Sequence, residues 1–145
     1  MIKVETTVHI NRPPHEVFIY LSNFENNPKW QSGMREARFT SEGPLRLGST
    51  YEQVASFLGR PVLSTFEVIA YEPGQMVKAT STSGSFPITF PRMVAAEGEG
   101  TRVTAVIEGD ASGFFKLAEP LLAPFVQRSV DNDYANLKKI LEAAR

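Results

Sequence analysis

The feature of this sequence that most constrains its fold is one long amphipathic segment near its C-terminal end. Apolar residues recur there at spacings of three and four, which predicts an α-helix with a single apolar stripe. They are Phe114, Leu117, Ala118, Leu121, Leu122, Phe125, Val126, Val130, Leu137, Ile140 and Leu141. Pro120 and Pro124 each remove a backbone hydrogen bond, so we expect a kink there and a regular helix over about 124–144. The stripe needs a second layer of structure to cover it.

The pattern between residues 34 and 112 supplies that layer. Short runs rich in Val, Thr, Phe and Tyr alternate with Gly and Pro turns, which is typical of an antiparallel meander. We expect strands near 34–41, 49–58, 62–71, 76–83, 86–96 and 101–111, and another over residues 1–10. Thr6 is the only polar residue on the inner row of that first strand. Gly98 to Val103 resembles a dinucleotide loop only weakly, because it leads into a strand, and is interpreted as a hairpin turn.

Two short helices are expected between the first two strands. Asn11 can cap a helix and Pro14 fits its first turn, which predicts a helix over about 14–21. Ser22 and Glu25 have the spacing of a capping box, which predicts a second helix ending near Gln31. These elements predict an α+β fold in which one curved sheet wraps around the stripe of the last helix.

Composition limits the function. The 145 residues predict one domain spanning 1–145, and the net charge of −1 argues against general nucleic-acid binding. No cysteine is present, which excludes thiolate catalysis and Cys-based metal sites. The N-terminal residues do not resemble a signal peptide and no apolar run is long enough to cross a bilayer. We therefore expect a cytoplasmic protein without integral membrane association.

Several ordered landmarks resemble one known family. They are the opening Val-His-Ile-Asn-Arg-Pro-Pro-His-Glu-Val-Phe, the segment from Phe24 to Trp30 that ends Asn-Pro-Lys-Trp, the Gly-Thr-Arg-Val-Thr hairpin at 100–104 and the closing Asn-Leu-Lys-Lys-Ile-Leu-Glu at 136–142. Together they resemble the START-like (SRPBCC) superfamily, in particular its polyketide cyclase/dehydrase branch, over nearly the whole chain. The resemblance implies a helix-grip fold, with seven antiparallel strands curled around the C-terminal helix and an apolar cavity between them.

A sheet bent around one helix leaves space where the two diverge, and side-chain volume decides whether that space is filled. The expected apolar wall consists of Phe57, Phe66, Phe90, Met93, Phe114, Leu121, Leu122 and Phe125. For any single one of these residues, ordinary core is the favoured interpretation. An open cavity of about 300–1,000 Å³ would bury a flat or elongated apolar molecule.

Polar side chains that point inward are more informative, because a ligand can be the partner that a buried polar group requires. Gln53 and Ser64 are candidate hydrogen-bond donors or acceptors in the cavity. Arg35 and Arg92 are either surface charges or cations at the cavity mouth that hold a carboxylate or phenolate. Trp30 either stacks on a ligand or packs the short helices onto the sheet; we favour packing.

No catalytic constellation is evident. His9 lies on the polar row of the first strand, and His15 lies in an exposed first turn without a second histidine at zinc-protease spacing. Asp131 and Asp133 are expected on the solvated face of the last helix. The catalytic residues are therefore unknown, and we expect no metal and no cofactor.

Two functions remain open. The first is binding, and transport, of a hydrophobic small molecule such as a lipid, isoprenoid or aromatic polyketide. The second is a polyketide cyclase/dehydrase-type enzyme in which Arg35, Tyr71 or Arg92 polarises a carbonyl in the same cavity. The predicted ligand-binding residues are Gln53, Phe57, Ser64, Phe66, Tyr71, Phe90, Arg92, Leu121 and Phe125. The ligand and the oligomeric state are not specified by the sequence.

Overall fold

The computed structural model describes residues 2–57, 59–83, 87–109 and 114–144, without the side chains of Ile2, Phe57 and residues 114–123. Strand β1 (Ile2–Ile10) is followed by α1 (Pro14–Ser22), the 3₁₀ turn η1 (Phe24–Asn26) and α2 (Asn27–Trp30). The later elements are β2 (Met34–Phe39), β3 (Thr50–Phe57), β4 (Arg60–Glu72), β5 (Met76–Ser83), β6 (Ile88–Glu97), β7 (Gly100–Gly109) and α3 (Phe114–Ala143). The predicted order of elements is confirmed.

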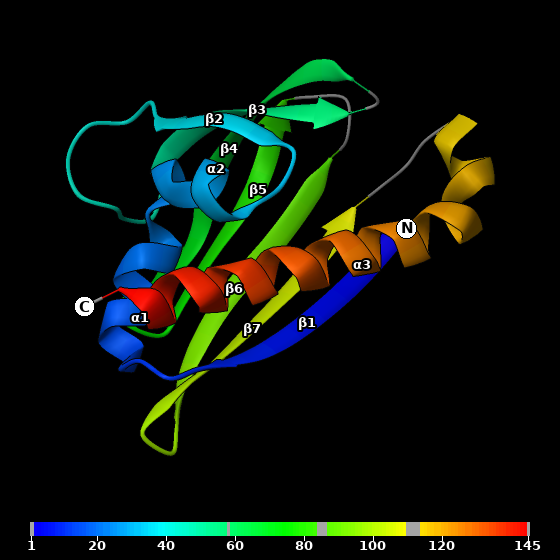
Figure 1. Cartoon of the computed structure of the whole chain (residues 1–145). Helices are drawn as coiled ribbons and strands as arrows, with labels where there is room; N and C mark the ends of the chain where they lie inside the picture. Colours follow the sequence, from blue (N-terminus) through cyan, green and yellow to red (C-terminus); the bar gives the residue numbers. More distant parts are fainter. Residues whose placement is uncertain (1, 58, 84–86, 110–113, 145) are drawn as a thin grey trace.

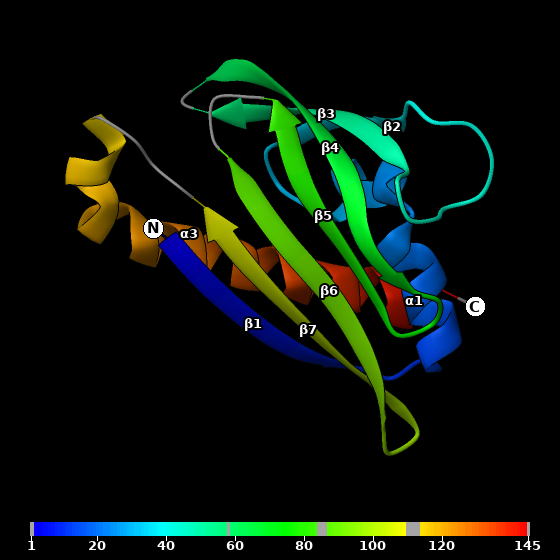
Figure 2. The same cartoon turned by 180° about the vertical axis from the view of Figure 1, so that it is seen from behind.

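The seven strands in this part of the chain form one antiparallel sheet in the order β1-β7-β6-β5-β4-β3-β2. The sheet curls, and α3 lies along its concave side with α1 and α2 beside the C-terminal half of that helix (Figure 1). In the opposite view, β4 to β7 lie in front of α3, and none of the described helices covers them (Figure 2). This is the helix-grip architecture that the resemblance implies.

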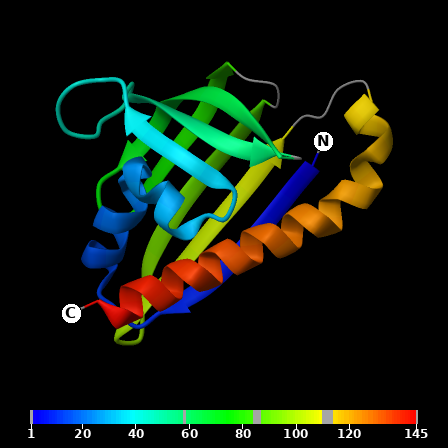
Figure 3. The same ribbon diagram turned by 45° about the horizontal axis from the view of Figure 1, so that its top comes forward.

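Helix α3 packs through the later part of its predicted stripe. Val130, Leu137 and Leu141 are buried in the core, together with Tyr134, which the sequence analysis did not include. Phe125 departs from the expectation, because its side chain is 67% exposed. Figure 3 shows that α3 changes direction in its N-terminal third, where Pro120 and Pro124 predict a kink. None of the helices in the described part of the chain is both long enough and apolar enough to cross a membrane.

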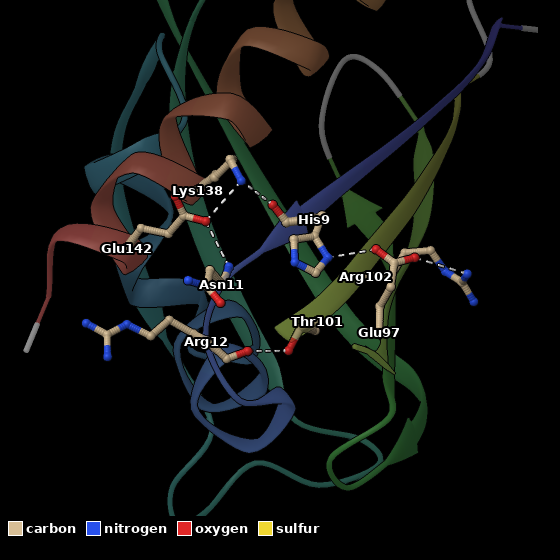
Figure 4. A network of polar contacts seen from close by, with 8 residues as sticks. All are labelled: His9, Asn11, Arg12, Glu97, Thr101, Arg102, Lys138 and Glu142. Carbon is tan, nitrogen blue, oxygen red and sulfur yellow. Dashed lines mark hydrogen bonds and ion pairs between the residues drawn. The ribbon is translucent and has the colours of Figure 1, made fainter. Parts of the chain in front are cut away.

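Polar contacts fasten the end of β1 to the C-terminal end of α3 (Figure 4). The backbone N–H of Asn11 donates to Glu142 Oε2 at 2.8 Å, and Lys138 Nζ donates to the His9 carbonyl at 2.6 Å. On the other side of β1, His9 Nδ1 lies 2.7 Å from Glu97 Oε1. These contacts hold the sheet and the helix together at the end that also carries α1.

The hairpin between β6 and β7 passes very close to the end of β1. Glu97 pairs with Gly100, which confirms the interpretation of this glycine-containing segment as a turn. A Cβ atom on Gly100 would lie 2.5 Å from the Ile10 carbonyl oxygen. The position therefore requires a glycine for reasons of space.

Two predicted helix caps are wrong. The N-cap of α1 is Pro13, without a side-chain cap, and Asn11 bonds α3 through its backbone instead. Ser22 remains inside α1, where its hydroxyl donates to the Phe18 carbonyl, so it cannot form a capping box with Glu25. Asn23 accepts from the Glu25 N–H and caps η1.

The two aspartates of α3 are more than a solvated face. Thr6 Oγ1 donates to Asp131 Oδ1 at 2.7 Å, which gives the polar residue of the inner β1 row its partner. The backbone N–H and the hydroxyl of Ser32 both donate to Asp133 Oδ1 at 3.0 Å. Both carboxylates therefore bind α3 to neighbouring elements. Asp131 is exposed, as the prediction of a solvated face has it, whereas Asp133 is half-buried because the helix lies against Ser32 there.

Candidate functional site

A cavity lies between the concave face of the sheet and α3. Its volume is about 90 Å³ and it is partly open to the exterior. We call it the interior cavity; the described residues that line it are Gln31, Met34, Gln53, Ile88, Phe90, Arg92, Ile107 and Tyr134. Three of the predicted ligand-binding residues, Gln53, Phe90 and Arg92, thus lie around one space. They come from β3 and β6, which are not adjacent in the sheet.

Arg92 is buried, with 2% of its surface exposed, so its interpretation as a surface charge is wrong. It occupies the inward row of β6, and its Nη1 donates at 3.0 Å both to the Leu21 carbonyl and to Asn27 Oδ1. Its guanidinium carbon lies 4.9 Å from the centroid of the Trp30 ring, and the rings of Phe24 and Phe90 are at 5.3 and 5.0 Å. These cation–π contacts and hydrogen bonds hold the charge in place.

Asn27 connects the predicted polar residues, and the sequence analysis missed it. Its Oδ1 accepts from Arg92, while its Nδ2 donates to Gln53 Oε1 at 3.2 Å. The side chain is almost completely buried at the start of α2. Its place in the Asn-Pro-Lys-Trp landmark was the available indication. The three residues form a buried polar chain, Gln53–Asn27–Arg92, on one side of the interior cavity.

Aromatic side chains fill much of the space beside this chain. Phe24 stacks on Tyr51 with ring centroids 4.2 Å apart, and Tyr51 stacks on Phe66 at 5.0 Å. Phe66 in turn meets Phe90 at 6.0 Å. The interior cavity is therefore smaller than the range expected from the sequence, because large rings occupy the inward positions of β3, β4 and β6.

Some buried polar atoms in this region have no hydrogen-bond partner among the described residues. They are Arg92 Nε, the Tyr51 hydroxyl, Trp30 Nε1 and Gln31 Oε1. Burial raises the pKa of the Tyr51 phenol, and the charge of Arg92 opposes that rise. Burial likewise raises the pKa of Tyr134, again against the charge of Arg92. Both phenols therefore remain neutral donors at physiological pH.

A second, larger hollow lies at the end of the molecule that carries α1. This end pocket has a volume of about 540 Å³ and is bounded by α1, the loop between β2 and β3, and the turn between β4 and β5. Tyr71 belongs to it, stacked on Phe18 with centroids 6.2 Å apart, and His15 lies at its rim. The structure therefore separates Tyr71 from Gln53, Phe90 and Arg92, which the sequence analysis placed in one cavity.

The remaining predicted residues are distributed as follows. Phe66 is buried in the aromatic stack, and Ser64 is half-buried opposite Gln53 on the neighbouring strand. Phe125 is exposed on α3, and the side chains of Phe57 and Leu121 lie outside the described part of the chain. Arg35 is exposed, and its Nε donates to Ser56 Oγ. Trp30 is buried and meets Tyr134 edge to face at 4.9 Å, so it packs α2 against α3.

The described residues bring no three His, Asp or Glu side chains together in a way that suits a metal ion. The chemistry of the interior cavity is instead that of neutral and cationic donors set in apolar walls. Such a site can bind and orient a molecule that is mostly apolar and carries an oxygen acceptor.

Solved structures share the fold at low sequence identity. The protein TTHA0849 from Thermus thermophilus is 20% identical, with a TM-score of 0.81 and 99% of each chain covered. An aromatase/cyclase from a Streptomyces species is 13% identical, with a TM-score of 0.76 and 97% of this chain and 93% of that chain covered. A START superfamily protein from Mycobacterium smegmatis is 15% identical, with a TM-score of 0.71 and coverage of 97% and 94%. No curated protein matches the sequence.

The family comparison agrees with the architecture. Residues 1–142 match the family described as polyketide cyclase/dehydrase and lipid transport. That match spans the first strand, the short helices, the curved sheet and nearly all of α3. This chain therefore belongs to the polyketide cyclase/dehydrase and lipid transport family.

Proposed function

We propose that the protein binds a hydrophobic small molecule, such as a lipid, isoprenoid or aromatic polyketide, in the interior cavity and carries it in solution. The observation that supports this most directly is the buried polar chain Gln53–Asn27–Arg92 beside apolar walls. A few convergent polar groups in an apolar hollow are the usual form of a small-molecule site. Family membership supports the same class of function.

The end pocket is the weaker candidate, although it is larger. Its buried polar lining residue, Ser22, already donates its hydroxyl to the Phe18 carbonyl. The interior cavity, by contrast, has donors without partners close by. Because the interior cavity is partly open, a ligand longer than the cavity can extend past its half-buried rim at Met34, Ile88 and Ile107.

Filling each hollow separately tests this proposal. Ile107 lines the interior cavity and Leu45 lines the end pocket, and both are partly buried apolar residues packed against the core. We expect the purified protein to bind the uncharged dye 1-aminoanthracene saturably, Ile107→Trp to abolish that binding, and Leu45→Trp to retain it. The reverse pattern would assign the ligand to the end pocket, and a wild type without saturable binding would contradict the proposal altogether.

A cyclase/dehydrase-type enzyme is the second candidate, favoured by Arg92 Nε, a donor of a cavity-lining residue that has no partner among the described residues. Such a donor can polarise a ketone and stabilise the enolate that forms when a proton is removed. None of the described residues that line the interior cavity is an Asp, Glu or His, so water would have to accept that proton. Turnover of a poly-keto substrate mimic by the wild type, lost in Arg92→Met, would support the enzyme; no turnover would leave binding alone.

A further inference from the structure

Arg92 carries a buried charge without an acidic partner. None of the ion pairs between described residues includes it. Its hydrogen-bond acceptors, the Leu21 carbonyl and the Asn27 amide oxygen, are both neutral, and so are the three rings around it. A buried cation is costly unless an anion compensates it, and here the protein's described residues supply dipoles and rings only.

The same arginine also has donor capacity left. Both of these hydrogen bonds leave from Nη1, while Nε has no partner among the described residues. Arg92 lines the interior cavity, so this donor lies beside an open space. Buried donors in folded proteins normally have an acceptor, and none of the described residues supplies one to Arg92 Nε, which points to a bound molecule as the acceptor.

The surroundings narrow the chemistry of that acceptor. One cation balances one negative charge, which suits a carboxylate better than a phosphate monoester with nearly two charges. A guanidinium presents a planar fork of donors that matches the two oxygens of a carboxylate. Met34, Ile88, Phe90 and Ile107 provide apolar contacts around the same cavity, and its volume of about 90 Å³ limits what fits inside to a small head and the first carbons.

We propose that the ligand is an apolar monocarboxylate whose carboxylate is held by Arg92 and whose apolar part leaves over Met34, Ile88 and Ile107. This inference rests on the proposed function, because it names the class of molecule that the interior cavity binds. The carboxylate supplies the missing negative charge, and the apolar part supplies the burial that favours binding.

Two matched probes test the inference on the unaltered protein. Decanoate and decanamide have the same chain, but only decanoate is charged at about pH 7.5. We expect calorimetric titration to give decanoate the tighter binding by about tenfold to a hundredfold, as for a hydrogen bond to a charged group. Equal affinities would overturn the carboxylate inference and leave the proposed function standing, whereas no binding of either probe would overturn both.

A salt series separates the buried charge from surface charge. Arg92 is shielded from solvent, so the preference for decanoate should persist in about 0.5 M NaCl, where exposed charges are largely screened. If the preference for decanoate disappears at this salt concentration, the interaction with the carboxylate takes place at the protein surface, which would contradict the inference.

Substitutions then locate the preference. Arg92→Met should remove it, and the matched control Arg35→Met, which deletes an exposed arginine outside the cavity lining, should retain it. Because Arg92→Met also breaks two structural hydrogen bonds, Ile107→Trp provides a second variant, which fills the interior cavity and leaves those two hydrogen bonds in place. Ile107→Trp should abolish decanoate binding; decanoate binding that is unchanged in this variant, or a preference that survives Arg92→Met, would overturn the inference.

Discussion

The hydroxyl of Thr6 on β1 donates a hydrogen bond of 2.7 Å to the carboxylate of Asp131 on α3, across 125 positions of sequence. Thr6 is the polar residue on the otherwise apolar inner row of β1, and Asp131 is its hydrogen-bond acceptor. Gln127 Nε2 donates to the same carboxylate oxygen at 3.1 Å. The contact therefore joins the edge of the sheet to the middle of the helix that the sheet surrounds.

Thr6→Val should lower the free energy of unfolding by about 1 kcal/mol, because the substitution removes a partly buried hydrogen bond and leaves the shape of the side chain nearly unchanged. Urea denaturation measures the change. Thr7→Val is the matched control, since Thr7 is exposed on the other face of the same strand and should tolerate valine. A Thr6→Val protein as stable as the Thr7→Val protein would show that the bond contributes nothing.

Asn27→Leu should destabilise the fold by about 1.5–3 kcal/mol, because it removes a hydrogen bond from a buried cation. It also leaves the Gln53 amide oxygen without the Asn27 donor. The measurement is chemical denaturation, together with decanoate titration of the variant. Asn23→Ala is the control, since Asn23 is an exposed cap whose loss should leave decanoate binding unaltered. Unchanged stability in Asn27→Leu would mean that the polar chain does not hold Arg92.

Asp133→Asn should make the protein more stable near neutral pH. Burial raises the pKa of Asp133, and the hydrogen bonds from Ser32 only partly oppose the rise. A raised native pKa means that the folded state binds the proton more tightly than the unfolded chain, so this group lowers stability as pH rises through the carboxyl range. Unfolding curves at several pH values should show the advantage of the variant growing with pH. An advantage confined to acid pH would contradict this sign.

Glu142→Gln should have the opposite pH dependence. Its pKa is lowered, first by the hydrogen bond from the Asn11 backbone and then by that from Lys138. A lowered native pKa gives stability that is present above the unfolded pKa and is lost as pH falls through the native one. The wild type should thus be more stable than the variant at neutral pH and equal to it in acid. A difference that persists below both pKa values would point to a cause other than this ionisation.

The periodicity of single elements made most of the fold predictable. Alternation placed Val4 and Ile10 inward on the first strand, and helical spacing placed Val130 and Leu137 on the buried side of α3. Both patterns are local, so they can be recognised in the sequence without knowledge of the tertiary structure. Phe125 is exposed because the helix bends where its prolines lie, and a repeat counted along a straight helix cannot follow that bend.

The candidate site was less predictable, because its key contacts join distant residues. Arg92 reaches acceptors 71 and 65 positions away, and arginine by composition is expected at the surface. The Asn-Pro-Lys-Trp landmark drew attention to the segment that contains Asn27, but the landmark does not show that this side chain connects Gln53 with Arg92. Tyr71 and Arg92 both lie in register with Val77 on neighbouring strands, so a shared cavity was a reasonable expectation. Tyr71 instead lines the end pocket, where it stacks on Phe18 of α1.

The pairing of β1 with β7 has a consequence for how the chain reaches this structure. Among the described strands, the first one has a single neighbour, which lies about a hundred residues later, from Ile2 opposite Gly109 to Ile10 opposite Thr101, and α3 then packs beside it. During synthesis on the ribosome, β1 therefore remains without its sheet partner until the residues of β7 have emerged. Such non-local pairing slows folding, and it leaves the backbone groups of the first strand unpaired in the meantime.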